Sequence, residues 1–174
     1  MKKKIDPFDC GKEILQAVKK GVLLTTKIDG QVNTMSISWG TMGIQWGLPI
    51  FTVFVRGCRH TSVMLDENPE FTVNIPLGSV DKEIIRYCGT KSGRDTDKIK
   101  DMGLHTEEPE VVCVPGIKEL PLTLECRVIY KQQQYPECMT DPAPPTHYPE
   151  NSQNIHADYH TAYYGQIVSA YIIE

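Results

Sequence analysis

Short segments rich in β-branched and aromatic residues dominate the chain, and they follow one another without regular alternation with helices. A parallel doubly wound sheet requires a strand–helix–strand rhythm, so this order of segments excludes it. An antiparallel barrel, closed or partly open, is the natural arrangement for about six such strands. The pattern therefore predicts a mainly β fold with short helices inserted. The expected strands span residues 22–28, 32–39, 50–56, 71–75, 122–130 and 163–173.

Turn and capping residues place the remaining elements. Asp29-Gly30 indicates a hairpin turn between the first two strands. A first helix is expected between a capping Asp9 and a terminal Gly21. Its apolar face would comprise Ile14, Leu15 and Val18. Three more short helices are expected at 61–67, at 79–88 with Asp81 in the first turn, and from the capping pattern Ser92-Gly-Arg-Asp95 to Met102.

Length and charge narrow the class of protein. The 174 residues favour a single domain over residues 1–174. The net charge of −4 argues against a broad nucleic-acid surface. The basic start is not followed by an apolar segment, and no apolar run is long enough for a membrane span, so we expect a cytoplasmic protein without a membrane partner. The six cysteines would then be reduced thiols, and Cys88 is the one to watch because it begins the candidate loop 88–95.

The run Arg56-Gly-Cys-Arg59-His60-Thr61 is the first candidate site. It follows an expected strand and opens an expected helix, where backbone N–H groups and the helix dipole favour an anion. Two guanidinium groups and a threonine hydroxyl added at that point predict a compact phosphate site. The alternative is a pair of surface arginines beside a capping threonine.

Two further runs have the composition of a ligand site. In Asn33-Thr34-Met35-Ser36-Ile-Ser38-Trp39-Gly40, hydroxyl groups alternate with large apolar side chains, and Gly40 permits close backbone approach to a flat ligand. The alternative is an edge strand with a solvated Ser/Thr face. The loop 88–95 adds Lys91 and Ser92 between two glycines, which indicates either a second anion contact or an ordinary helix connection.

Histidines near the C-terminal strand raise the question of a metal. His156, Asp158 and His160 would share one face of an extended strand, as a divalent metal requires. No further strong ligand lies near these residues in sequence, and an isolated histidine pair is most often solvated or hydrogen-bonded, so we predict no metal site. Residues 135–154, just upstream, are rich in proline and are expected to form a long loop.

Read together, the runs resemble the flavin reductase-like family, and within it the flavoredoxins most. The resemblance covers roughly residue 21 to the C-terminus, with the proline-rich stretch as an unmatched insertion. It implies a six-stranded antiparallel Greek-key split β-barrel that binds FMN and forms a homodimer. The runs that carry it are Asn33–Gly40, Phe51–Thr61, Glu70–Pro76, Cys88–Asp95 and His160–Gly165.

The resemblance also implies roles for these residues. The FMN phosphate would bind near Arg56, Arg59, His60 and Thr61 with help from Lys91 and Ser92, and the segment Asn33–Trp39 would follow the isoalloxazine ring and ribityl chain. His160 would act on the nicotinamide side. The implied activity is transfer of electrons from NADH or NADPH through FMN to an acceptor. The alternatives are an FMN electron carrier reduced by a redox partner protein, and a flavin-binding module without turnover.

Overall fold

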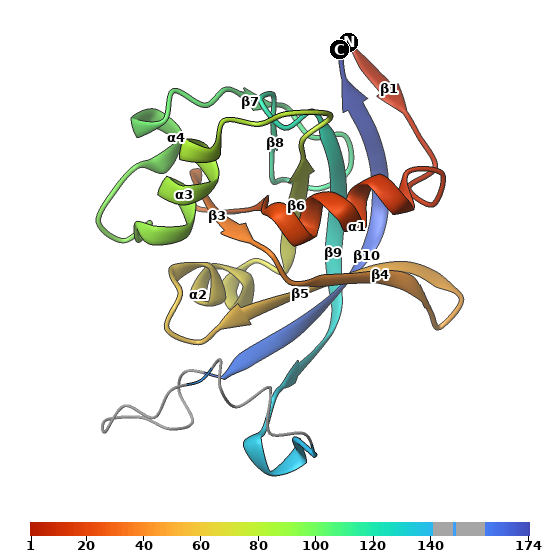
Figure 1. Ribbon diagram of the computed structural model, residues 1–174, viewed down its shortest axis with the longest axis vertical. Helices are drawn as coiled ribbons and strands as arrows, with labels where there is room; N and C mark the ends of the chain where they lie inside the picture. Colours follow the sequence, from red (N-terminus) through yellow and green to blue (C-terminus); the bar gives the residue numbers. More distant parts are fainter. Residues whose placement is uncertain (141–147, 149–158) are drawn as a thin grey trace.

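The predicted strands pair in one antiparallel sheet whose order is β3–β2–β6–β9–β10–β5–β4, with β1 added on β10 (Figure 1). The structure is a computed structural model that describes residues 1–140, 148 and 159–174. In these residues the main sheet has eight strands rather than six, and the mainly β, antiparallel prediction is confirmed. The strands are β1 (Lys2–Lys4), β2 (Val22–Ile28), β3 (Gln31–Ile37), β4 (Gly40–Gln45), β5 (Leu48–Arg56), β6 (Glu70–Ile75), β9 (Leu122–Gln133) and β10 (His160–Ile173).

The helices are short and lie between the strands. They are α1 (Gly11–Lys20), α2 (His60–Glu67), α3 (Lys82–Thr90) and α4 (Lys98–Asp101), with a 3₁₀ turn at Pro136–Cys138. A two-stranded sheet, β7 (Thr106–Glu107) and β8 (Gly116–Ile117), completes the described elements. No helix in the described part of the chain is long and apolar enough to span a bilayer.

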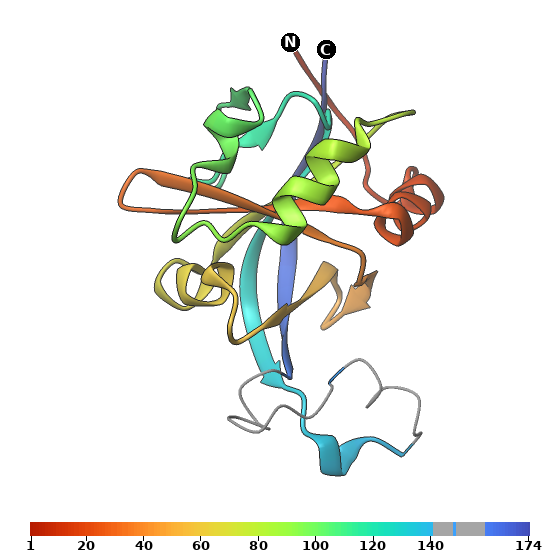
Figure 2. The ribbon, with the colours of Figure 1, turned by 60° about the vertical axis from the view of Figure 1, so that its left-hand side comes forward.

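The long strand β10 organises the sheet. Its first half pairs with β5, its end pairs with β1, and β9 follows it along almost its whole length. The two chain ends therefore lie side by side (Figures 1 and 2). The β9–β10 register shifts at Gly165, where an added Cβ would collide with the Phe71 ring. Glycine at this position lets the strand cross the packed interior.

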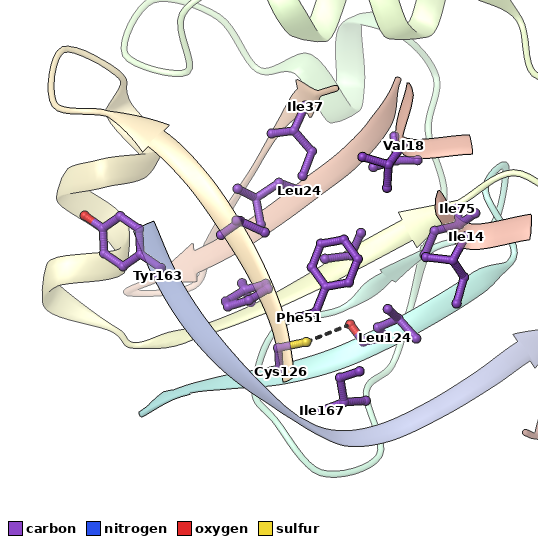
Figure 3. Packing of buried hydrophobic residues seen from close by; sticks show 14 of the residues in the cluster. Ile14, Val18, Leu24, Ile37, Phe51, Ile75, Leu124, Cys126, Tyr163 and Ile167 are labelled. Carbon is purple, nitrogen blue, oxygen red and sulfur yellow. Dashed lines mark hydrogen bonds between the residues drawn. The ribbon is translucent and has the colours of Figure 1, made fainter. Parts of the chain in front are cut away.

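The main core fills the space enclosed by the sheet and α1 (Figure 3). Phe51, Phe71 and Tyr163 are almost fully buried there, together with aliphatic side chains from β9. Helix α1 contributes Ile14 and Val18, one turn apart on its buried face. Each fully buried side chain of this size contributes about 1.5–3 kcal/mol from removal of apolar surface from water.

A second apolar cluster forms beneath α3 and α4 on the other side of β2. It includes Leu23 of β2 and Ile84 and Cys88 of α3. Figure 2 shows these two helices on the same side of the β2–β3 hairpin. This packing fixes the ends of the loop between α3 and α4, which carries Lys91 and Ser92.

Some local predictions are wrong, each for a local reason. Strand β4 was not expected; the turn that joins it to β5 is Trp46-Gly47, where both residues have positive φ and form a tight hairpin. Leu15 is exposed, because only the narrow stripe of Ile14 and Val18 faces the core. Ser92 does not begin a helix: its hydroxyl accepts from the N–H of Arg94 and closes a turn.

Three cap assignments also change. Helix α4 begins only after Asp97, whose carboxylate accepts from the N–H of Lys100. Asp81 is the N-cap of α3 rather than a first-turn residue, and it accepts from the N–H of Glu83. The N-cap of α1 is Cys10, not Asp9. The predicted Asp29-Gly30 hairpin is confirmed, with both residues at positive φ.

Candidate functional site

A cavity of about 210 Å³ opens where β3, β5 and β10 end or begin. In the antiparallel register His160 lies opposite Arg56. The ring centroid of Trp39 is 4.8 Å from that of His160. Three residues that are distant in sequence therefore meet at one site. Seven predicted site residues line the cavity, together with Ile37 and Phe54, which were not predicted: Met35, Ser36, Ser38, Trp39, Arg56, Arg59 and His160.

The first turn of α2 is tied to β3 and to the loop before α4. The hydroxyl of Thr61, which is buried, accepts a hydrogen bond from the Asn33 amide at 3.1 Å. Arg94 donates to the carbonyl of Cys58 at 2.9 Å. Arg59 occupies the N-cap position, where free backbone N–H groups and the helix dipole favour an anion. The predicted phosphate motif therefore lies at the start of a helix that hydrogen bonds from Asn33 and Arg94 hold in place.

A buried lysine that the sequence analysis missed lies beside this helix start. Lys98 is only 4% exposed, and its ammonium group donates to the carbonyls of Thr34 at 2.9 Å and Cys88 at 3.2 Å. Burial lowers the pKa of Lys98, and the charge of Arg59 lowers it further. No carboxylate in the described part of the chain lies within ion-pair distance of this ammonium group. A buried cation without a carboxylate partner is suited to an anionic ligand.

Thr34 and Lys91 are placed away from the cavity. The side chain of Thr34 is fully buried and bonds to the hydroxyl of Thr25 at 3.1 Å and to the carbonyl of Leu24. Alternation along β3 could not reveal this, because the cross-strand partner decides which hydroxyl is used internally. Lys91 is exposed at the C-cap of α3, and Ser92 beside it closes the turn to Arg94.

His60 lies at the first position of α2 and is half-buried. Burial lowers the pKa of His60, and the nearby charges of Arg94 and Lys98 lower it further. Its imidazole is therefore neutral at pH 7, since the ordinary histidine pKa is already about 6.5. It can serve as a hydrogen-bonding group, whereas the charge at this end of the site comes from arginine and lysine.

His160 has a second contact that the sequence did not indicate. Its Nδ1 lies 2.6 Å from the hydroxyl of Tyr148, and the two rings meet edge to face at 5.4 Å. The guanidinium of Arg56 lies 5.3 Å from the centre of the Tyr148 ring. His156 and Asp158, considered above as metal ligands, lie outside the described residues. Within the described residues no group of three metal-ligating side chains occurs.

The site fits a flat ring that carries a phosphate. Arg56, Arg59 and the helix start supply positive charge, and the rings of Trp39 and Phe54 supply an apolar wall. Close backbone approach also shapes the site: a Cβ at Gly93 would collide with Oδ1 of Asn33. Cys88 is buried, and burial raises its pKa to about 11, so it is protonated at neutral pH.

Comparison with known proteins identifies the fold family. The sequence pattern of the flavin reductase like domain matches residues 16–174. The chain belongs to the flavin reductase-like family. The resemblance drawn from the sequence motifs is therefore confirmed, and the barrel is the split barrel of this family.

Three known proteins illustrate what this chain is similar to. The flavoredoxin of Methanosarcina acetivorans is 27% identical, with a TM-score of 0.66, over 88% of this chain and 68% of that one. An FMN-binding domain of a flavin reductase-like enzyme from Shewanella baltica is 15% identical, with a TM-score of 0.67, over 99% of this chain and 77% of that one, and shows the fold alone. An uncharacterized protein of Archaeoglobus fulgidus is 31% identical over 97 residues, 56% of this chain. The match spans about half of that relative, 54% of its length.

Proposed function

We propose that this protein is an FMN-dependent oxidoreductase that takes hydride from NADH or NADPH and passes electrons to an acceptor. One observation carries the proposal: a single cavity joins two arginines at a helix start to a tryptophan and a phenylalanine. Few ligands other than a phosphorylated aromatic cofactor need both ends. Membership of the flavin reductase-like family supports flavin as that cofactor.

Each end of the cavity has a separate task. Arg56 and Arg59 would bind the phosphate through charge-assisted hydrogen bonds. Asn33 and Thr61, already bonded to each other, would hold the helix start in place. Trp39 would pack against the isoalloxazine ring. FMN, when bound, supplies the hydride and single-electron chemistry, while the protein supplies orientation and electrostatics.

His160 would orient the nicotinamide. It lies at the cavity, where its imidazole is held by Trp39 and Tyr148. Rates of hydride transfer depend steeply on the alignment of the two rings. His160→Ala should therefore leave FMN occupancy nearly unchanged and slow reduction by NADH or NADPH. Loss of FMN from this variant, or reduction at the wild-type rate, would contradict the role.

The deciding experiment is reconstitution followed by anaerobic stopped-flow reduction. The purified protein is titrated with FMN and with riboflavin, and the FMN complex is then mixed with NADH or NADPH while the 450 nm band is followed. FMN should bind more tightly than riboflavin, and the band should bleach. Failure to bind FMN would overturn the whole proposal. Binding without bleaching would leave a flavin-binding protein that does not use nicotinamide.

A flavoredoxin-like electron carrier is the second candidate. The observation that favours it is the 27% identity to a flavoredoxin over 88% of this chain. Such a carrier would be reduced by a redox partner protein. FMN that is inert to NADH and NADPH but is reduced rapidly by a low-potential protein donor would select this candidate.

The active form would be a homodimer. An exposed aromatic patch supports this: Ile44 is 73% exposed, Trp46 60% and Tyr130 44%, and the rings of Trp46, Tyr130 and Tyr164 contact one another. Clustered exposed aromatic side chains are typical of protein interfaces.

Light scattering tests the dimer. Wild type should run at twice the mass of the 19.6 kDa chain. Trp46→Asp should produce monomer without unfolding, because aspartate tolerates the positive φ at this turn. Tyr135→Asp, at an exposed residue outside the aromatic patch, is the matched control and should remain dimeric. If the wild type is monomeric at roughly micromolar concentration, the dimer is refuted.

A further inference from the structure

Tyr148 comes from the proline-rich stretch, and it packs against two residues of the candidate site, His160 and Arg56. Its side chain is buried, with 8% exposure. Its hydroxyl lies 2.6 Å from Nδ1 of His160 and 3.0 Å from Oε1 of Gln134. Its ring stacks on Tyr159 at 4.3 Å and lies 5.3 Å from the guanidinium of Arg56. One side chain therefore contacts both a predicted phosphate ligand and the predicted nicotinamide residue.

The hydroxyl has one proton, which determines how it pairs with His160. The amide oxygen Oε1 of Gln134 can only accept, so Tyr148 donates its proton there. Towards His160 the same hydroxyl oxygen must then accept, and Nδ1 must carry the hydrogen. Gln134 is itself fixed next to His160, because its backbone N–H donates to the carbonyl of His160 at 2.9 Å.

The rings around His160 prevent its imidazole from turning. The centroid of the imidazole lies 4.8 Å from the ring centroid of Trp39 and 5.4 Å from that of Tyr148, which meets it edge to face. Reversing the imidazole would exchange Nδ1 for a carbon atom and break the hydrogen bond to Tyr148. The orientation of this residue is thus set by side chains rather than by its backbone alone.

We propose that Tyr148 is a positioning residue of this site: its hydroxyl holds His160 in the Nδ1–H tautomer, and its ring supports Arg56. The effect on electron transfer rests on the proposed function, whereas the tautomer does not. The hydroxyl of Tyr148 thus determines which nitrogen of the His160 imidazole carries the proton.

The tautomer is measured in the FMN-free protein by two-dimensional ¹⁵N–¹H NMR of the imidazole nitrogens. The chain has five histidines, so the His160 signals are assigned by their loss in His160→Asn. Wild type should show Nδ1–H for His160. Tyr148→Phe keeps the ring and removes the hydroxyl, and should shift the tautomer ratio by about fivefold or more, the value of one ordinary hydrogen bond.

Tyr159→Phe is the matched control, since it removes a hydroxyl from the ring stacked on Tyr148 and should leave the His160 signals unchanged. Three results would overturn the proposal: an Nε2–H tautomer in wild type, identical spectra for wild type and Tyr148→Phe, or the same change in Tyr159→Phe.

The functional arm uses the FMN complex. Tyr148→Phe should bind FMN as wild type does, because the ring beside Arg56 remains, and should alter the pH profile of reduction by NADH or NADPH. Tyr148→Leu, which also removes the ring, should weaken FMN binding. An unchanged pH profile in Tyr148→Phe, or unchanged FMN binding in Tyr148→Leu, would overturn that half of the role. If wild type is not reduced at all, the proposed function fails while the NMR result still decides the tautomer.

Discussion

Replacement of Lys98 by methionine should separate FMN binding from folding. Methionine keeps the length of the side chain and removes its charge. Lys98 is buried, donates to two backbone carbonyls, and lies close enough to Arg59 for the two charges to interact. If this cation serves the phosphate of FMN, its loss should weaken FMN binding and spare the fold.

The magnitudes follow from the contacts. A hydrogen bond to a charged group contributes about 1.5–3 kcal/mol, so the FMN dissociation constant should rise about ten- to a hundredfold. The free protein should change little. Lys98→Met gives up two bonds from a charged donor to carbonyls, each worth about 1.5–3 kcal/mol. It also removes a buried charge, whose cost is visible in the lowered pKa of Lys98. The two effects offset each other.

The assay pairs a flavin titration with urea unfolding. FMN and riboflavin are titrated by quenching of flavin fluorescence, and unfolding is followed without flavin. Lys100→Met, on the same helix but exposed, is the matched control and should match wild type in both measurements. Equal loss of FMN and riboflavin binding in Lys98→Met would show that the residue supports structure alone. Unchanged FMN binding would refute the phosphate assignment.

Three further predictions test the same site. Replacing Arg56 and Arg59 together by alanine should weaken FMN binding by well over tenfold, since a charge-assisted hydrogen bond from each arginine contributes about 1.5–3 kcal/mol. The difference in affinity between FMN and riboflavin should become smaller. Equal wild-type affinity for the two flavins would contradict this prediction. FMN affinity should fall as pH rises through the lowered pKa of Lys98, because the bound phosphate would raise that pKa and the complex would therefore hold more protons than the free protein; titrations below the ordinary lysine pKa of about 10.4 should show this slope in wild type and a smaller slope in Lys98→Met. Cys88→Ser should retain FMN and electron transfer, because a buried thiol whose pKa is raised to about 11 supplies no thiolate; loss of electron transfer with FMN still bound would overturn it.

Local chemistry made the strand pattern and the first motif predictable. Alternation and turn residues located six of the strands, and the helix after Arg56–Thr61 begins within one residue of the expected position. Strand β4 escaped prediction because its six residues include two glycines, and its turn requires a tryptophan at positive φ. Such a residue is rare in that conformation, so tertiary pairing with β5 must impose it.

The parts of the site that were missed depend on contacts between distant segments. Lys98 is buried only because α4 packs against β3, and a lysine on a four-residue helix has no sequence signal for burial. Tyr148 lies in a proline-rich stretch and acquires its place from His160, Gln134 and Arg56. Thr34, by contrast, has a hydroxyl that could bind a ligand, but this hydroxyl is buried and accepts a hydrogen bond from Thr25.

The cations near the start of α2 bear on the proposed phosphate site. Some cations elsewhere pair with carboxylates: Lys131 pairs with Asp66 at 2.7 Å, and Arg127 pairs with Glu70 at 3.0 Å. Around the start of α2, Arg59, Arg94 and Lys98 have no carboxylate partner within the described ranges. Burial is the main cause of the lowered pKa of Lys98, and the charge of Arg59 lowers it further; His60 has a pKa lowered by burial and then by the charges of Arg94 and Lys98. Arg59 and Arg94 are exposed to solvent, whereas Lys98 is buried without a paired charge among the described residues, an arrangement that is costly for stability alone. Under the proposed function, a bound phosphate would offset the cost of the buried Lys98 charge, which lies near Arg59 at the start of α2.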